Sequence, residues 1–169
     1  PKPTLADDEM RRLAADTFGI TGDLRHLDSE RDQNVQVGAY VVKIANVAED
    51  AAALELQHAA LAHLAVTDPA LSLPRLAPPG IVRHGDHLVR AVSFLPGVPY
   101  ATVPHTPALR HALGRFMGRV SKGLQGFGHP AAHRAGFLWN LDEAQAVRAW
   151  TADIANTEDR AAVEATFHR

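Results

Sequence analysis

Apolar residues recur at helical spacing in the first segment of the chain, from Leu5 to Phe18. Thr4, with Asp7 three residues later, forms a capping-box-like start, and Gly19 interrupts the period. The pattern therefore predicts a short first helix that begins directly behind Thr4.

Five runs of strand-like composition come next, separated by turns or by longer connections. A charged tip joins the first two runs, Gly38 joins the second to the third, and Gly85 with Asp86 joins the last two. The runs occupy 23–29, 34–37, 40–45, 81–83 and 87–94. This order predicts an antiparallel sheet of about five strands.

A helix is expected between the third and fourth strands. Asn46, with Glu49 three residues on, forms a second capping box, and the alanine-rich segment that continues to Ala65 has high helix propensity. We expect this helix to follow the third strand directly and to pack on one face of the sheet.

The second half of the chain has the pattern of a helical segment. Thr106 and Pro107 form a strong cap and first-turn pair ahead of a regular helical period. Further helices are expected at 141–154 and 158–167, the later one capped by Thr157. The predicted parts are an N-terminal lobe at 1–95, a hinge or linker at 96–106 and an incomplete helical part at 107–169.

Composition narrows the classes of function. The 169 residues are 46% hydrophobic, enough for one real core, and the formal charge of −2 comes without any basic block. This argues against nucleic acid or a membrane surface as partner and favours a small molecule. The chain has no cysteine, which excludes disulfides, thiol catalysis and cysteine-ligated zinc. It has no secretory or membrane-length apolar run, so we expect a cytoplasmic protein.

Six short motifs, in a consistent order, link the chain to a known family. They are SERDQN at 29–34, YVVKIAN at 40–46, ELQHAALAHL at 55–64, FLPG at 94–97, GFGHP at 126–130 and FLWNL at 137–141. With them the chain resembles the aminoglycoside phosphotransferase-like kinases, most closely the hydroxylysine kinase branch and the related domain at the front of some bacterial class III aminotransferase fusions.

The resemblance implies an α+β fold. Its first part would be a protein-kinase-like small lobe, an antiparallel sheet of about five strands with a packed helix, and a truncated α-helical part would follow. It also implies a nucleotide, ATP or GTP with Mg²⁺, as cofactor. No His-x-Asp-x-x-x-x-Asn segment follows the hinge in these 169 residues. Together with the start at Pro1, this suggests a piece of a longer polypeptide that is inactive by itself.

Lys43 is the first candidate site residue. Side chains alternate along a strand, so Val42 and Ile44 face one way and Lys43 the other, toward the cleft between the sheet and the second half. The resemblance implies that Lys43 contacts nucleotide phosphates and is held by an acidic residue on the following helix. The alternative is a lysine on the solvated face of an edge strand.

The partner of Lys43 stays open between Glu55 and Gln57. The two lie about 200° apart on a helix, at ~100° per residue, so both cannot face the same lysine. The buried stripe of the helix favours Gln57. Charge favours Glu55, because an ion pair positions the lysine and also neutralises it. Glu55 could equally be a solvated helix residue.

The remaining candidates lie at a hairpin tip and at the expected hinge. The tip has no G-x-G-x-x-G pattern, so phosphates would be bound by backbone N–H groups and by side-chain donors of Ser29, Arg31, Asp32 and Asn34. It could also be an ordinary hydrophilic turn. At the hinge, backbone groups of Phe94 and Leu95 would recognise a purine, whose faces Val41, Ile81 or Val92 would cover.

Two sets of residues suggest a catalytic motif or a metal site but have simpler explanations. His84-Gly85-Asp86 repeats the start of the family's catalytic HGD signature, yet it lies between two strands, where Gly-Asp suits a hairpin turn. The ten histidines include no helical H-E-x-x-H pair. We therefore expect neither a catalytic residue nor a metal site in these residues.

Two functions follow from this pattern. The first is the nucleotide-binding part of a small-molecule kinase, which in its complete form transfers phosphate from ATP or GTP to a hydroxyl of an amino-acid-like or amino-sugar-like acceptor. The second is a non-catalytic kinase-like module that docks against other domains of a longer chain, such as a pyridoxal-phosphate (PLP) aminotransferase; PLP would then belong to that domain. A homodimer that pairs open apolar faces is a further expectation.

Overall fold

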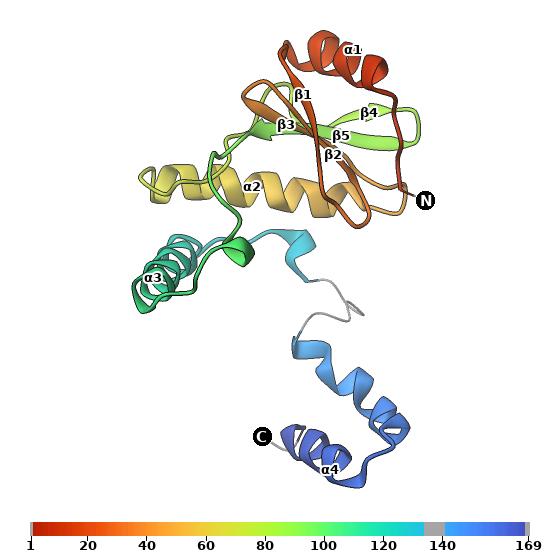
Figure 1. Ribbon diagram of the computed structural model, residues 1–169, viewed down its shortest axis with the longest axis vertical. Coiled ribbons are helices and arrows are strands. Elements are labelled where there is room, and N and C mark those ends of the chain that lie inside the picture. Colours follow the sequence, from red (N-terminus) through yellow and green to blue (C-terminus); the bar gives the residue numbers. More distant parts are fainter. Residues whose placement is uncertain (1, 134–140, 168–169) are drawn as a thin grey trace. The chain divides into compact units, whose positions relative to one another are not determined.

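The computed structural model describes residues 2–133 and 141–167, and the chain forms two compact units, Pro1–His129 and Pro130–Arg169 (Figure 1). The first unit contains the sheet and three α-helices, α1 to α3. Of the motif at 137–141, residues 137–140 lie outside the described residues. The fold is α+β, with a five-stranded sheet and helices, as predicted.

The sheet is antiparallel throughout, with strand order β1-β2-β3-β5-β4. The strands are β1 (Leu24–Leu27), β2 (Gln33–Val37), β3 (Tyr40–Ile44), β4 (Val82–His84) and β5 (His87–Ser93). All five predicted strands exist, with shifted ends. The first is three residues shorter than expected, because only Leu24–Leu27 pairs with β2. β3 and β5 are central, so Lys43 does not lie on an edge strand.

Helix α1 (Asp7–Phe18) covers one face of the sheet (Figure 1). Its Met10, Leu13 and Ala14 are buried against inward-facing strand residues. The sheet contributes to this core Val35, Val37, Val42, Ile44, Val89 and Ala91. Val42 and Ile44 therefore face α1, which places Lys43 on the opposite face.

The predicted start of α1 at Thr4 is wrong. The N-cap is Ala6, without a side-chain cap, and the helix begins at Asp7. The reason lies in Gln33 on β2. Its side-chain amide accepts from the Leu5 N–H at 2.7 Å and donates to the Leu5 carbonyl at 2.9 Å. Because Gln33 takes both backbone groups of Leu5, the preceding segment stays outside the helix.

Helix α2 (Ala51–Thr67) lies on the other face of the sheet (Figure 1). Its N-cap is Asp50, whose carboxylate accepts from the Ala52 N–H at 3.0 Å, so the capping box predicted at Asn46 is wrong. The Asn46 side chain instead accepts from the Ala48 N–H at 2.9 Å, which forms a local turn. This turn delays the helix by several residues after β3.

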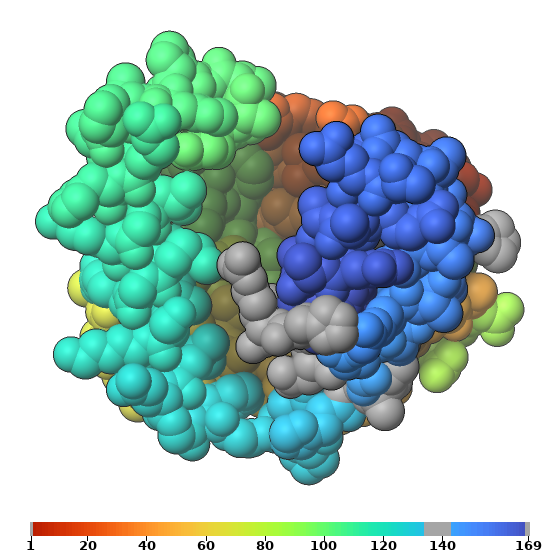
Figure 2. Space-filling view, turned by 90° about the horizontal axis from the view of Figure 1, so that it is seen from below, coloured from red at the N-terminus to blue at the C-terminus, as the bar shows by residue number. Residues whose placement is uncertain are grey.

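Helix α3 (Pro107–Gly123) begins as predicted, because the Thr106 hydroxyl accepts from the Leu109 N–H at 3.1 Å. Its end packs against α2, where His63 Nε2 lies 3.0 Å from the Gly123 carbonyl oxygen. A short 3₁₀ turn, η1 (Tyr100–Thr102), precedes it. The surface of α3 is drawn in teal in Figure 2, and Met117 on it is 53% exposed.

The second unit contains η3 (Leu141–Asp153) and α4 (Thr157–Thr166) after the short turn η2 (Pro130–Ala132). Asn156, not the predicted Thr157, caps α4 by accepting from the Glu158 and Asp159 N–H groups. η3 is a 3₁₀ helix where an α-helix was predicted. Apolar spacing over one segment does not separate these two helix types, because their periods of 3.0 and 3.6 are close. In the described parts of the chain, no helix is long and apolar enough to cross a membrane.

A close backbone approach at Gly38 gives the first prediction. Gly38 has φ +55°, and a Cβ there would lie 2.6 Å from the Thr21 carbonyl oxygen. Gly85 has nearly the same φ, +56°, with nothing within 4 Å of such a Cβ. We expect Gly38→Ala to lower the free energy of unfolding by about 2–4 kcal/mol and Gly85→Ala by about 1 kcal/mol. Urea unfolding measures both, and equal losses would contradict the close contact.

Candidate functional site

The candidate site is built on the sheet face that points away from α1. In an antiparallel sheet, side chains at directly opposed positions lie on the same face. The pairing opposes Leu27 to Asn34, Asn34 to Lys43, and Lys43 to Arg90. These four residues therefore form one row across β1, β2, β3 and β5. Val41 and Val92, opposed to each other, lie beside the row on the same face.

Lys43 occupies the predicted face, and its ammonium is held in an unfavourable environment. Burial and the nearby Arg90 guanidinium lower the pKa of Lys43 from its ordinary value of 10.5, while Asp32 opposes this effect. Across residues 2–133 and 141–167, Lys43 makes no hydrogen bond or ion pair with another side chain. A desolvated cation without a partner is suited to an anionic ligand.

Neither Glu55 nor Gln57 holds Lys43. Gln57 Oε1 instead accepts a hydrogen bond from Arg90 Nη2, and Glu55 is exposed to solvent. Gln57, a predicted partner of Lys43, is thus hydrogen-bonded to Arg90 on the neighbouring strand β5. The expected clamp between Lys43 and the helix is not formed in this structure.

Arg90 is buried, with 8% of its surface exposed. Burial lowers the pKa of Arg90 from its ordinary value, whereas the charges of Asp32 and Glu49 act in the opposite direction. Among the described residues Asp32 forms no ion pair with Arg90. Asp32 Oδ1 accepts from the Asn46 backbone N–H at 3.1 Å and from Asn46 Nδ2 at 3.3 Å. Two cations thus stand side by side without a bonded carboxylate.

Two buried polar atoms in this region have no partner among the described residues, Asn34 Oδ1 and His58 Nε2. Asn34 lies directly opposite Lys43. His58 follows Gln57 on α2, and burial together with Arg90 lowers the pKa of its imidazole from the ordinary value of 6.5. Buried polar atoms normally have partners, so these two are open to a hydrogen bond from a ligand.

The hairpin tip between β1 and β2 closes on itself. The Asp32 N–H donates to the Ser29 hydroxyl at 3.3 Å, and Lys2 Nζ donates to the Ser29 carbonyl oxygen. The Asp32 N–H is therefore engaged within the turn, while the Ser29 hydroxyl keeps its own proton to donate. Arg31 is exposed. The tip is next to the row that contains Lys43, because Asn34 at the end of the tip is directly opposed to Lys43.

A hollow of about 620 Å³ lies between β1 and the expected hinge. Its lining comprises Arg25, His26, Leu27, Asp28, Phe94, Leu95, Gly97, Val98 and Pro99. The Arg25 guanidinium lies 5.5 Å from the centre of the Phe94 ring and donates to Gln36 Oε1 at 2.7 and 3.2 Å. Arg25 and Leu27 belong to the same sheet face as Lys43, so this hollow continues the candidate site. None of the three residues expected to cover a purine, Val41, Ile81 and Val92, is in its lining.

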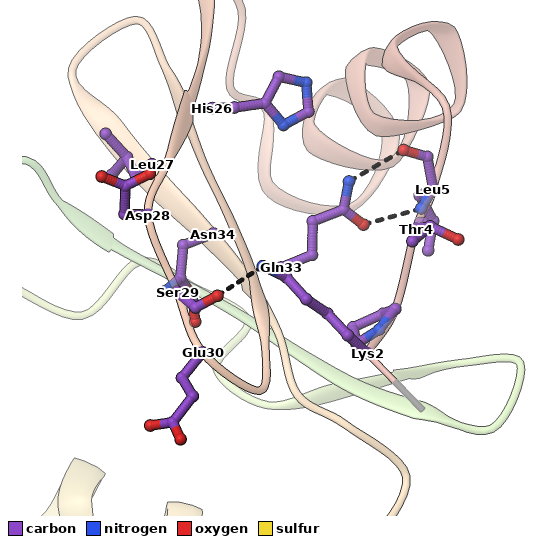
Figure 3. A pocket seen from close by; sticks show the side chains of 11 residues that line it. Lys2, Thr4, Leu5, His26, Leu27, Asp28, Ser29, Glu30, Gln33 and Asn34 are labelled. Carbon is purple, nitrogen blue, oxygen red and sulfur yellow. Dashed lines mark hydrogen bonds between the residues drawn. The ribbon is translucent and has the colours of Figure 1, made fainter.

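A larger hollow, of about 780 Å³, lies beside the N-terminal segment (Figure 3). Figure 3 shows Gln33 turned toward Leu5 and Lys2 turned toward Ser29, each joined by the hydrogen bonds described above. Neither Lys43 nor the hinge residues line it. Its Gln33 and Lys2 side chains already hydrogen-bond to the chain's own backbone, and of the candidate residues only Ser29 and Asn34 line it, so it is not our candidate site.

The two histidines at the β4–β5 turn, His84 and His87, have structural contacts. His84 and His87 form the opposed pair of the β4–β5 hairpin around Gly85, which confirms the predicted turn at His84-Gly85-Asp86. His84 Nε2 lies 3.0 Å from Glu9 Oε1, and His87 Nδ1 lies 2.7 Å from the Ala45 carbonyl oxygen. In the described parts of the chain, no cluster of three His, Cys, Asp or Glu side chains could hold a metal ion.

Sequence reasoning missed Arg90 and His58. Arg90 could have been found, because a charged residue inside the apolar run LVRAV of a central strand is unusual and needs a reason. His58 gives no comparable signal, since histidine is common on partly exposed helix faces.

Comparisons with known proteins identify the family of this chain. A family model described as "Phosphotransferase enzyme family" matches residues 23–169. Hydroxylysine kinase of Mus musculus is 25% identical over 193 aligned positions, which cover 96% of this chain and 51% of that protein. The Xenopus laevis hydroxylysine kinase is 26% identical over 191 positions, with the same coverage. Hydroxylysine kinase of Bos taurus is 33% identical over 81 residues, 46% of this chain and 22% of that protein.

This chain spans about half the length of the two relatives that it matches almost throughout. The family model covers the sheet, α2, α3 and the second unit. The family match and the five-stranded sheet with its helices support the same assignment. The chain belongs to the phosphotransferase enzyme family.

Proposed function

We propose that this chain is the nucleotide-binding part of a small-molecule phosphotransferase. The observation that carries the proposal is the pair of adjacent cations, Lys43 and Arg90, neither of which forms an ion pair with a described carboxylate, on the sheet face that continues into the hinge hollow. A polyphosphate is the natural ligand for desolvated cations, and a hollow of this size suits a nucleoside.

Every predicted site residue except Glu55 and Gln57 has a proposed role here in nucleotide binding. Lys43 binds phosphate oxygens, and the tip residues Ser29, Arg31, Asp32 and Asn34 cover them. At the hinge, the Phe94 N–H already donates to the Ala39 carbonyl at 2.8 Å. Leu95 is 41% exposed, and its backbone groups make no hydrogen bond with another described residue. We therefore assign purine recognition to the backbone of Leu95, with Phe94 beside the base.

The reaction requires groups that the described residues do not provide. ATP or GTP would supply the phosphoryl group. The acceptor would carry a hydroxyl on an amino-acid-like or amino-sugar-like molecule, because relatives carry the name hydroxylysine kinase. The described ranges contain no cluster of three His, Cys, Asp or Glu side chains that could hold Mg²⁺. We propose that the catalytic base and the metal ligands are not among these residues, and that the protein acts in the cytoplasm, where ATP is abundant.

A second function is favoured by one specific observation. Neither Glu55 nor Gln57 contacts Lys43, although a lysine held by the helix is part of an active kinase lobe. This suits a non-catalytic regulatory or scaffold module of a multidomain protein, such as one with a PLP-dependent aminotransferase. Dimerisation also remains a proposal.

Calorimetric titration tests the leading proposal. We expect this chain to bind ATP or GTP, each with Mg²⁺, saturably and with a dissociation constant in the micromolar to millimolar range, and to bind the nucleoside alone more weakly. No phosphoryl transfer to hydroxylysine is expected from these residues alone. Absence of nucleotide binding, both by this chain and by a longer protein that contains it, would reject the leading proposal and favour the scaffold.

A further inference from the structure

We propose that Arg90 is a second phosphate-binding residue that acts together with Lys43, and that Gln57 positions its guanidinium. This inference rests on the proposed function, because it concerns the same site. It assigns the ligand as a di- or triphosphate that spans two cations, rather than a single carboxylate or a monoanion.

The register of the sheet places the two cations together. Lys43 on β3 is directly opposed to Arg90 on β5. Directly opposed residues have Cβ atoms about 4.5–5.5 Å apart, and like charges at such positions are destabilising. Both strands have a neighbouring strand on each side, so neither backbone can shift to move the two charges apart. A ligand with several negative charges would relieve this repulsion for both residues at once.

The hydrogen bonds of Arg90 leave most of its donors unused. A guanidinium has five N–H donors, and the single hydrogen bond described for Arg90 is the one from Nη2 to Gln57. Asp32 and Glu49 lie near enough to influence the guanidinium, yet neither forms an ion pair with it in the described chain. The planar fork of an arginine suits bidentate contact with phosphate.

Gln57 is chemically suited to positioning. Its amide oxygen fixes one end of the guanidinium without neutralising the charge, whereas a glutamate at 57 would form an ion pair and reduce the attraction for an anion. The unpartnered Asn34 and His58 atoms lie beside the same cations. Rotation of the Asn34 amide presents an N–H₂ donor to a phosphate oxygen in this row.

The test uses inorganic tripolyphosphate, which has no base or sugar, with ATP and adenosine as comparison ligands. The variants are Arg90→Lys, which keeps the charge and loses the fork, and Gln57→Glu, which keeps the shape and neutralises Arg90. The matched control is Arg83→Gln on the same sheet, where the arginine is exposed. We expect tripolyphosphate and ATP binding to weaken about 10- to 100-fold in both variants. Adenosine binding should not change, and the control should behave as wild type.

The outcomes separate this inference from the proposed function. If wild type binds ATP and both variants bind it equally well, Arg90 has only a structural role and the inference is overturned, while the proposed function stands. If wild type binds neither ATP nor tripolyphosphate, the proposed function fails and this inference fails with it. Should Arg90→Lys lose its fold in a thermal melt, Gln57→Glu decides, since it adds an ion pair to an intact site.

Discussion

Lys43→Met is expected to abolish most nucleotide binding while leaving the protein equally stable or more stable. The variant removes the charge-assisted hydrogen bonds that the ammonium offers to phosphate, each worth about 1.5–3 kcal/mol, so the dissociation constant should rise about 10- to 100-fold or more. Stability should not fall, because burial and Arg90 disfavour the charged lysine in the folded protein, as its lowered pKa indicates. Methionine keeps the length of the side chain without the charge.

The pH dependence has a definite sign. The pKa of Lys43 in the folded protein lies below its ordinary value of 10.5, so between these two values the unfolded chain binds more protons than the folded one. The free energy of unfolding of wild type should therefore gain a positive contribution as pH rises through this window. Lys43→Met should lack this contribution.

Thermal melts and calorimetric titration with Mg²⁺ and ATP measure both effects. Lys122→Met, at the exposed end of α3, removes the same charge at a distant position and serves as the control. A Lys43→Met protein that binds ATP as tightly as wild type would remove Lys43 from the site. Loss of binding together with loss of fold would show that the lysine is structural.

Met10→Ala is expected to reduce stability without weakening nucleotide binding. The free energy of unfolding should fall by about 2–5 kcal/mol. Met10 is fully buried between α1 and the sheet, where truncation leaves a cavity among Val35, Val42 and Ile44. The folded fraction should still bind nucleotide with unchanged affinity, because α1 covers the face of the sheet opposite to Lys43.

Urea unfolding provides the measurement for this second variant, with Leu113→Ala as the control. Leu113 on α3 is 41% exposed, so its truncation should have a much smaller effect. Similar losses for the two variants would contradict the assignment of the core to the α1 face. Weaker nucleotide binding by folded Met10→Ala would contradict the separation of the two faces.

The strands and the orientation of Lys43 could be predicted from the sequence, because alternation along YVVKI assigns each side chain to a face. The hydrogen-bond partner of Gln57 on the helix could not be predicted in this way. Gln57 meets Arg90 because β5 inserts between β3 and β4, and this register between distant strands leaves no local signal. The predicted choice between Glu55 and Gln57 assumed that Lys43 was the only cation on that face.

The errors at the helix starts have a similar cause. Thr4 is a residue type that often caps helices, but Gln33, 28 residues after Leu5, hydrogen-bonds to both backbone groups of Leu5. Asn46 forms its own turn, and Asp50 provides the cap. Thr106 was correctly predicted, because its cap involves only neighbours in the sequence. Local signals are reliable where no distant side chain competes for the same backbone groups.

The most direct test of the nucleotide site is amide chemical-shift mapping of the wild-type chain as ATP and Mg²⁺ are added. The account predicts that the perturbed amides cluster at the tip (29–34), around Lys43, around Arg90 and at the hinge (94–98). These segments form one face with the hinge hollow. Perturbations confined to residues 2–5, the tip and α1, without changes around Lys43, Arg90 or 94–98, would contradict it, because the tip also lines the larger hollow.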